Sequence, residues 1–298
     1  MDASIIITAR NEDPQVLEAT LAGVEATTRH LRAELVVVDD GSERVVQCRG
    51  RRLQLVRNDV SAGTCKARRI GAELAAGPFL VWLDAHMSFG TGWLEQLLVH
   101  ADTRSLLCSP FWTYDLKRCM CWGADIRWSS TRDYFAGKQP GFSLVHRTTE
   151  PDLAITQVPM VIGACYAMQR AAYEELGGFS PLYRVWGLDE LDLCSRAWMA
   201  GLGVACVSFA KVGHLSRAAF PYAVQYDHLE FNQMVLLHTI FDTDTIARLG
   251  AHFSPLPQQP SAWLAETDLT PWRSLVQAKR RMSDVEFFRR FSPEVLAG

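Results

Sequence analysis

The sequence lacks the features that mark membrane, secreted and polyanion-binding chains. No apolar run approaches the roughly 20 residues that a transmembrane helix needs, and Met1 leads straight into an expected strand with no signal-peptide pattern. The 30 basic and 33 acidic side chains nearly cancel, and the formal net charge is −3. No overall charge therefore favours a nucleic-acid or lipid partner. We expect a cytoplasmic protein with no membrane partner.

Several common cofactor motifs are also missing. None of the eight cysteines forms a C-x-x-C pair, and Cys119-Met120-Cys121 is spaced too tightly for a usual zinc knuckle. We expect buried free thiols, as in a reducing compartment. Gly63 opens a basic segment, GTCKARR, but the glycine spacing of a Walker loop or a dinucleotide fingerprint is absent.

The first hundred residues alternate short apolar runs with segments of helical spacing. Strands are expected at 4–9, 34–38, 53–56 and 79–83, and helices at 13–30, 63–76 and 91–101. The strands are continuous apolar runs, which is typical of strands buried on both faces. This alternation predicts the α/β class, with a Rossmann-like, doubly wound and mostly parallel sheet.

The rest of the chain is less regular. Residues 104–150 mix aromatic and basic side chains and are interpreted as an insertion of loops and a hairpin. Further elements are expected as strands at 163–168 and 204–207 and helices at 171–176, 189–200, 223–250 and 272–290, the last of them basic. Pro255, Pro257, Pro260 and Pro271 predict a linker over 254–271.

The strand at 79–83 runs into Asp84-Ala85-His86. A carboxylate and an imidazole two residues apart in extended backbone point the same way. At the carboxyl end of a parallel strand they would face the usual ligand crevice of an open α/β sheet, where a divalent ion can clamp a diphosphate. The alternative is a helix N-cap beside a surface histidine.

Three other motifs carry polar side chains at element ends. Asp39-Asp40-Gly41-Ser42 follows a strand, where a carboxylate can bind a nucleoside or simply start a turn. Trp186-Gly187-Leu188-Asp189-Glu190 places acids in the first turn of a helix, either as caps or as a site. His214 and Arg217 follow the last expected strand, as a third metal ligand and a phosphate-binding fork or as surface residues.

Together these motifs resemble the catalytic domain of the polypeptide N-acetylgalactosaminyltransferases, within the GT-A glycosyltransferases. The resemblance covers about residues 4–222. The motifs that carry it, in family order, include Ile7-Thr8 with Asn11-Glu12, Asp39-Asp40, Gly63 with Arg68, Leu83 to His86, Gly163, Trp186-Gly187, Gly213-His214, and Arg217 with Tyr222.

The resemblance implies a role for each matching residue. Asp84, His86 and His214 would hold Mn²⁺ or Mg²⁺, Thr8 and Asp40 or Asp39 would hold uridine, and Arg217 and Tyr222 would close a loop over the diphosphate. Asn11, Glu12, Arg68, Ala85 and Gly163 would complete the nucleotide-sugar site. Trp186, Asp189 and Glu190 would be catalytic. The implied units are a GT-A domain at 1–222, with an acceptor-side insertion at 104–157, and a helical extension at 223–298.

The sequence departs from the family at Leu188-Asp189-Glu190, where the family has the motif Gly-Gly-Glu-Asn. Asp189 stands where the family has Glu, and Glu190 stands where it has Asn. The resemblance implies a retaining transfer from a UDP-sugar to a hydroxyl. Inverting relatives place a general base at the position of Glu190, so an inverting enzyme acting on a small molecule or glycan is the alternative.

The acceptor stays open at this point. A peptide Ser or Thr follows from the resemblance. A hydroxymethylated DNA base follows from the aromatic and basic mixture in 104–150 and from the basic residues of 273–290, because such surfaces track phosphates and stack on bases. A nucleic-acid-binding pseudoenzyme is the non-enzyme alternative.

Overall fold

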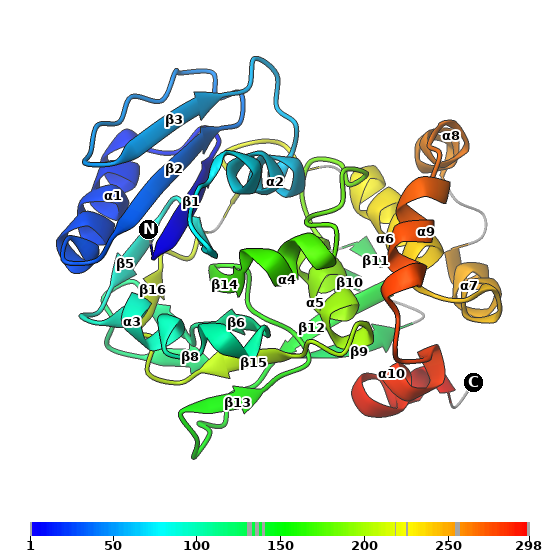
Figure 1. Ribbon diagram of the computed structural model, residues 1–298. Helices are drawn as coiled ribbons and strands as arrows, with labels where there is room; N and C mark the ends of the chain where they lie inside the picture. The colour runs from blue at the N-terminus through cyan, green and yellow to red at the C-terminus, as the bar shows by residue number, and fades with distance from the viewer. Residues whose placement is uncertain are drawn as a thin grey trace.

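The computed structural model describes residues 2–129, 133–134, 137–138, 141–217, 219–224, 226–253 and 257–296. A mixed sheet of eight strands lies at the centre, in the order β13-β15-β6-β14-β4-β1-β2-β3 (Figure 1). Its strands are β1 (Ala3–Ala9), β2 (Ala33–Asp39), β3 (Leu53–Arg57), β4 (Phe79–Asp84), β6 (Leu106–Cys108), β13 (Ile155–Gln157), β14 (Cys165–Gln169) and β15 (Val204–Val207).

Strands β1 to β4 are parallel, as the sequence predicts. The sheet is mostly parallel, as predicted, and β15 is also parallel to β6. The exceptions are β14, which runs antiparallel to both β4 and β6, and β13, which runs antiparallel to β15. Since β14 is antiparallel to β4, its first residues lie beside the end of β4. Cys165 pairs with Leu83, and the amide of Asp84 donates to the carbonyl of Ala164 at 3.1 Å. Gly163 is thereby brought next to Asp84.

Helices cover both faces of the sheet. Ile5 and Ile7 belong to one core cluster with residues of α1 (Pro14–Thr28) and α3 (Trp93–Leu98). Ile6 lies in the other core cluster, with residues of three further helices: α2 (Thr64–Leu74), α4 (Arg170–Glu175) and α5 (Asp189–Met199). Successive strand residues point to opposite faces, so this division confirms the predicted sheet buried on both sides.

A second, smaller sheet has the order β5-β16-β7-β8. Its strands are β5 (Met87–Phe89), β7 (Phe111–Thr113), β8 (Cys119–Cys121) and β16 (Val212–His214). The sequence analysis predicted none of these as strands. The carboxyl end of β16 lies against the start of β5, since His214 pairs with Met87. The small sheet thereby places His214, the last residue of β16, close to Asp84 at the end of β4 in the large sheet.

The range 104–157, predicted as an acceptor-side insertion, contains both a hairpin and strands of the main sheet. A hairpin forms there between β9 (Ala124–Ser129) and β12 (Gly141–His146), with a short pair β10 (Asp133–Tyr134) and β11 (Gly137–Lys138). The two ends of the range, β6 and β13, are strands of the main sheet instead. Arg132 and Phe135, and the side chains of Tyr134 and Lys138, lie outside the described residues.

The described C-terminal residues are mainly helical. The helices are α6 (Tyr226–Ile240), α7 (Thr243–Gly250), α8 (Gln258–Glu266), α9 (Thr270–Lys279) and α10 (Asp284–Phe291), with 3₁₀ turns at Ala251–Phe253 and Pro293–Leu296; a further 3₁₀ turn, Ala101–Thr103, follows α3. They share a core with the central sheet, since Phe288 of α10 and Trp82 of β4 belong to one cluster of buried residues. The ring of Phe288 also stacks on Phe142 of the hairpin strand β12, with 6.1 Å between centroids. Among the described residues, no helix is both long and apolar enough to cross a membrane.

Two predictions for this region are wrong. The linker at 254–271 contains helix α8, because Pro257 is its N-cap and Pro260 lies in its first turn, where a missing N–H costs no helical hydrogen bond. Pro255 lies outside the described residues. The basic helix at 272–290 is two helices, since α9 ends at Lys279 and Ser283 starts α10 with a capping box. All eight cysteines are free thiols, as predicted, and six of them are buried, whereas Cys48 and Cys119 are half-buried.

Candidate metal centre and substrate cavity

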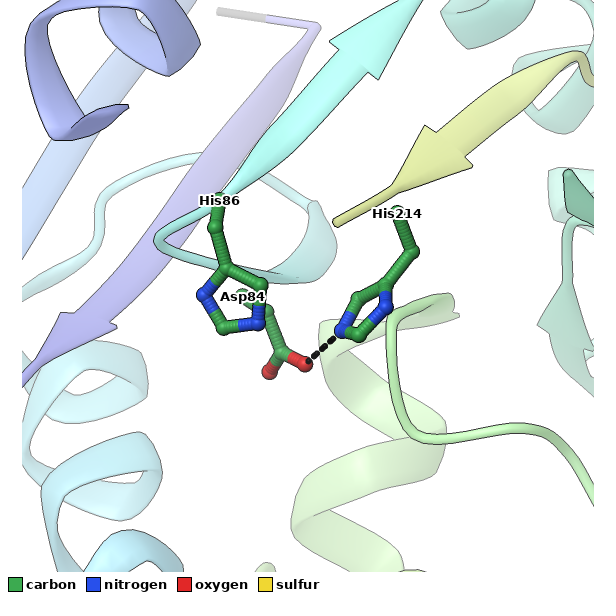
Figure 2. A group of neighbouring side chains, drawn as sticks. All are labelled: Asp84, His86 and His214. Carbon is green, nitrogen blue, oxygen red and sulfur yellow. Dashed lines mark ion pairs between the residues drawn. The ribbon is translucent and has the colours of Figure 1, made fainter. Parts of the chain in front are cut away.

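Asp84, His86 and His214 meet where the two sheets join. Asp84 ends β4, His86 lies two residues on, just before β5, and His214 ends β16. The amide of Leu215 donates to the carbonyl of His86 at 3.0 Å, which holds the two histidine backbones together. One ligand atom from each of the three side chains lies within 4.8 Å of the others. Figure 2 shows the two imidazoles on either side of Asp84, with Nε2 of His214 3.3 Å from Oδ2 of Asp84.

This donor set fits a divalent metal ion. Imidazole nitrogen with carboxylate oxygen suits Mn²⁺ and its neighbours in the first transition series. Burial opposes ionisation of Asp84, but the hydrogen bond from His214 and the charge of Arg68 outweigh it and lower the pKa of Asp84 to about 2. The carboxylate is therefore charged at neutral pH. Nδ1 of His214 is buried and has no hydrogen-bond partner among the described residues.

Arg68 ties the metal centre to the start of α5. Its Nη1 lies 2.5 Å from both Oδ2 of Asp189 and Oε1 of Glu190, and its Nη2 lies 3.2 Å from Oδ1 of Asp84. Nη2 also donates to the carbonyl of Gly163 at 3.2 Å. One buried guanidinium thus neutralises part of the charge of three carboxylates. Arg68 reaches the cavity wall through these contacts.

The two predicted catalytic acids have different surroundings. The side chain of Asp189 is 2% exposed, whereas that of Glu190 is 17% exposed and lines the cavity. Burial, followed by the neighbouring charge of Glu190, raises the pKa of Asp189 to about 7 in spite of Arg68. Of this pair, Glu190 is the carboxylate that faces the cavity.

The two adjacent acids at the end of β2, Asp39 and Asp40, also have different surroundings. Asp39 is buried, accepts a hydrogen bond from the amide of Ser42 at 3.0 Å and forms an ion pair with Arg57. Asp40 lines the cavity and accepts from the hydroxyl of Ser61 at 2.7 Å and the amide of Gly63 at 2.9 Å. The oxygens of Asp39 are therefore held inside the turn, and of the two acids only Asp40 lines the cavity.

A single cavity of about 770 Å³ contains most of the predicted site residues. Those in its lining are Thr8, Glu12, Asp40, Arg68, Asp84, Ala85, His86, Gly163, Trp186, Glu190, His214, Arg217 and Tyr222. Asn11, Asp39 and Asp189 lie outside the lining. The side chain of Asn11 instead donates to the carbonyl of Pro221 at 3.3 Å, so it holds the segment that carries Tyr222.

The sequence analysis missed two parts of the lining. Arg10 lies over the ring of Tyr222, with 4.7 Å from its Cζ to the ring centroid, and follows directly on the motif that contains Thr8. The second part is apolar and comes from five distant segments: Phe111, Leu144, Met160, Ile162, Phe220 and Leu229. No local pattern marks these residues, because each is an ordinary apolar side chain until the fold assembles them.

The basic C-terminal residues lie elsewhere. The described residues 257–296 contribute nothing to the cavity lining. Arg273 donates to the carbonyl of Phe241 at 2.8 Å, Nη2 of Arg280 lies 2.5 Å from Oδ1 of Asp284, and Arg290 bonds to Gln157 at 2.8 Å. Arg273 and Arg280 therefore connect helices, and Arg290 connects α10 to β13. Lys279, Arg281, Arg289 and Arg290 are exposed, but this basic surface lies away from the cavity lining.

Comparison with known proteins identifies the family of this chain. The model of glycosyl transferase family 2 matches residues 4–177, which is more than half of the chain. This chain belongs to glycosyl transferase family 2. A second model, described as the N-terminal domain of galactosyltransferase, matches residues 146–218 and so includes Trp186 and His214.

Curated relatives are polypeptide N-acetylgalactosaminyltransferases, which confirms the resemblance. The chain is 28% identical to enzyme 11 of Xenopus tropicalis over 270 residues, covering 80% of this chain and 43% of that protein. It is 29% identical to enzyme 3 of Drosophila melanogaster over 241 residues, covering 74% of this chain and 35% of that protein. The chain thus spans less than half the length of these relatives.

Solved structures confirm the GT-A fold. GalNAc-T7, solved with UDP, GalNAc and Mn²⁺, superposes with a TM-score of 0.77 at 20% identity, covering 97% of this chain and 57% of that one. TarS of S. aureus, in complex with UDP-GlcNAc, has a TM-score of 0.52 at 12% identity, covering 97% of this chain and 90% of that one. The α/β fold class predicted from the sequence is therefore confirmed.

Proposed function

We propose that this chain transfers a sugar from a UDP-sugar to the hydroxyl of a peptide Ser or Thr. The observation that carries the proposal is one cavity whose lining combines two kinds of side chain. Asp84, His86 and His214 are polar and could hold a metal ion, whereas residues such as Phe111, Met160 and Leu229 are apolar. The polar side chains suit a nucleoside diphosphate, and the apolar ones suit an acceptor without charge.

On the donor side, Thr8 and Asp40 would bind uridine, and Asp84, His86 and His214 would hold Mn²⁺ or Mg²⁺. When bound, such an ion neutralises the diphosphate and assists departure of UDP. Arg217 and Tyr222 stand on the same loop and would close over the phosphates, which excludes water. Trp186 would pack beside the leaving phosphate. Arg10 lies over the ring of Tyr222 and adds positive charge to the part of the cavity that would hold the diphosphate.

During transfer, the bond from the anomeric carbon to the phosphate oxygen breaks, and UDP leaves with the electron pair of that bond. The acceptor oxygen bonds to the anomeric carbon, and the proton of the acceptor hydroxyl passes to the departing UDP oxygen. We propose that the anomeric configuration is retained, on the resemblance to the polypeptide N-acetylgalactosaminyltransferases. Inversion is the second candidate, and one observation favours it. Glu190 faces the cavity while Asp189 does not, so Glu190 is placed to take the proton of the acceptor hydroxyl as a general base.

The peptide acceptor is favoured over modified DNA by the cavity lining. Among the described lining residues there is no lysine, and the arginines are Arg10, Arg68 and Arg217, which this proposal assigns to the donor and the metal centre. A DNA backbone would require further cationic side chains. The curated relatives are named for a polypeptide acceptor. We keep residues 1–222 as the proposed catalytic unit, noting that Tyr226 and Leu229 of the extension also line the cavity. The cytoplasmic location stays a prediction.

The test is sugar transfer from several UDP-sugars with Mn²⁺, with mass detection of products. A Ser/Thr peptide library, hydroxymethylcytosine DNA and a panel of small hydroxyl compounds serve as parallel acceptors. A sugar-sized mass on peptide supports the proposal. A mass on DNA alone or on a small molecule alone overturns the acceptor class. DNA binding without any UDP-sugar turnover would favour the pseudoenzyme alternative.

A further inference from the structure

The geometry points to Glu12 as a positioning residue that serves the metal centre and the closing loop together. It orients the imidazole of His86 with one carboxylate oxygen and holds Arg217 with the other. This inference rests on the proposed function for its purpose, but its physical content concerns contacts that are measurable without any sugar transfer.

Glu12 is held in place by the turn that follows β1. Asn11 has a positive φ of 51°, which directs the chain away from the strand. The amide of Asn11 donates to the hydroxyl of Ser42 at 2.9 Å, and its side-chain oxygen accepts from the amide of Glu43 at 2.8 Å. The side chain of Glu12 is only 4% exposed. The carboxylate therefore has a fixed position behind the metal centre rather than a mobile one at the surface.

One oxygen of Glu12 sets the role of His86. Oε2 lies 3.1 Å from Nδ1 of His86. A neutral imidazole carries its proton on one nitrogen only, and a carboxylate at Nδ1 favours the proton there, which leaves the lone pair of Nε2 for a metal. The other oxygen of the same carboxylate pairs with Arg217, a contact that favours its charged, accepting form.

His214 provides the contrast. Its Nδ1 is buried and has no partner in the part of the chain that the structure describes. Ring contacts hold it instead: its centroid lies 5.0 Å from that of Phe111 and 4.6 Å from that of His86. Of the two histidines, His86 alone has a carboxylate on its far nitrogen. Losing Glu12 should therefore affect the orientation of His86 directly and that of His214 only through ring contact.

The other oxygen of Glu12 forms an ion pair with Arg217. The preceding residue, Asn11, donates to the carbonyl of Pro221 in the same loop at 3.3 Å. Two consecutive residues thus hold two points of the segment that carries Arg217 and Tyr222. Metal binding and loop position share one anchor, so a change at Glu12 should weaken both, whereas a change at Arg217 should weaken only the binding of the nucleotide.

The experiment compares Glu12→Ala, Glu12→Gln and Arg217→Ala with the full-length wild type. Mn²⁺ affinity is measured by electron paramagnetic resonance titration without nucleotide, and UDP affinity by calorimetry with Mn²⁺ present. We expect Glu12→Ala to weaken Mn²⁺ binding about 10- to 100-fold. Glu12→Gln should weaken it less, since the amide oxygen still accepts from Nδ1. Arg217→Ala should keep the wild-type Mn²⁺ affinity and weaken UDP binding.

A second readout is nitrogen-15 NMR of the histidines in the metal-free protein. Glu12→Ala should shift the tautomer of His86 away from Nδ1–H and leave that of His214 largely unchanged. Glu18→Ala, in the exposed part of α1, is the matched control and should match the wild type throughout. Circular dichroism of each variant verifies folding.

Wild-type Mn²⁺ affinity in a folded Glu12→Ala variant would overturn the inference, as would an unchanged His86 tautomer or a wild type that binds no Mn²⁺. The inference and the proposed function fail separately. If the wild type transfers no sugar but Glu12→Ala still weakens Mn²⁺ binding, the positioning role stands and the proposed function falls. If transfer occurs and Glu12→Ala binds Mn²⁺ normally, only the positioning role falls.

Discussion

A β-carbon added to Gly163 would lie 2.4 Å from Oε1 of Glu190. No side-chain atom fits between the start of β14 and this carboxylate, so the glycine is what allows Glu190 to stand beside Arg68. The contact brings together the start of β14 and the start of α5. Glu190 is the only carboxylate of α5 in the cavity lining, and Arg68 connects it to Asp84 by bonding to both side chains.

Gly163→Ala should therefore impair turnover with little loss of stability. The added methyl group meets the flexible end of Glu190, which can rotate away, so the fold tolerates it while the carboxylate leaves its position. We expect kcat/KM to fall at least about 10-fold, as for a displaced acid–base group, and the melting temperature to change little. Gly250→Ala, where nothing lies within 4 Å of the new atom, is the control and should retain activity.

Asp84→Ala and His214→Ala should each abolish metal-dependent UDP-sugar turnover. Removing one of three protein ligands weakens the ion that offsets the diphosphate charge, so we expect losses of at least about 100-fold. Turnover assays across a Mn²⁺ series measure the effect, with circular dichroism as the folding control. Full activity in either folded variant would show that the ion is held elsewhere.

Glu190→Gln separates the two stereochemical outcomes. In an inverting enzyme it removes the general base, and kcat should fall about 10²- to 10⁴-fold. In a retaining enzyme the amide keeps the bond to Arg68, so activity should be impaired but present. The anomeric configuration of the wild-type product, measured by proton NMR, decides the same question independently, and disagreement between the two readouts would exclude the simple base role.

Asp189→Asn should change how stability depends on pH. The pKa of Asp189 is about 7 in the folded protein against 3.8 for the ordinary group. The folded state therefore binds this proton more tightly than the unfolded chain does. Its contribution to the free energy of unfolding is largest at low pH, declines as pH rises from about 4 to about 7, and is then level, with a slope of at most about 1.4 kcal/mol per pH unit.

Because asparagine does not titrate in this range, the variant should lack that decline. Urea denaturation at several pH values between 4 and 8 gives the comparison. Wild-type and variant curves that stay parallel across this interval would contradict the raised pKa. Glu73→Gln, on the exposed end of α2, provides a control that removes a carboxylate outside the buried cluster.

The sequence predicted best where strands are long and wholly apolar. The strands that end at Asp39 and Asp84 are buried on both faces, so their pattern is continuous and their ends are clear. The position of the cavity could be predicted from these strand ends, because ligands of open α/β sheets bind at the carboxyl ends of the strands. Which of Asp39 and Asp40 faces the cavity could not be predicted, because that choice depends on the turn at 42–46 folding back over Asp39.

The small sheet was beyond sequence reasoning for a different reason. Each of β5, β7, β8 and β16 has three residues, too few for a periodic pattern. Yet β16 is what delivers His214 to the metal centre. The direction of β14 was equally hidden, since an apolar run reads the same in either direction and only its pairing with β4 shows that it is antiparallel.

The junction of the two sheets has a thermodynamic consequence. Asp84 leaves the large sheet and His214 ends the small one, so any ion that binds both acts as a cross-link between parts of the chain that meet only after folding. An ion that binds the folded state alone raises its stability with the logarithm of its free concentration. The ion should therefore stabilise the folded protein as well as assist the transfer. Thermal unfolding measured across a Mn²⁺ series should show a melting temperature that rises with Mn²⁺ concentration, with both sheets unfolding in one transition.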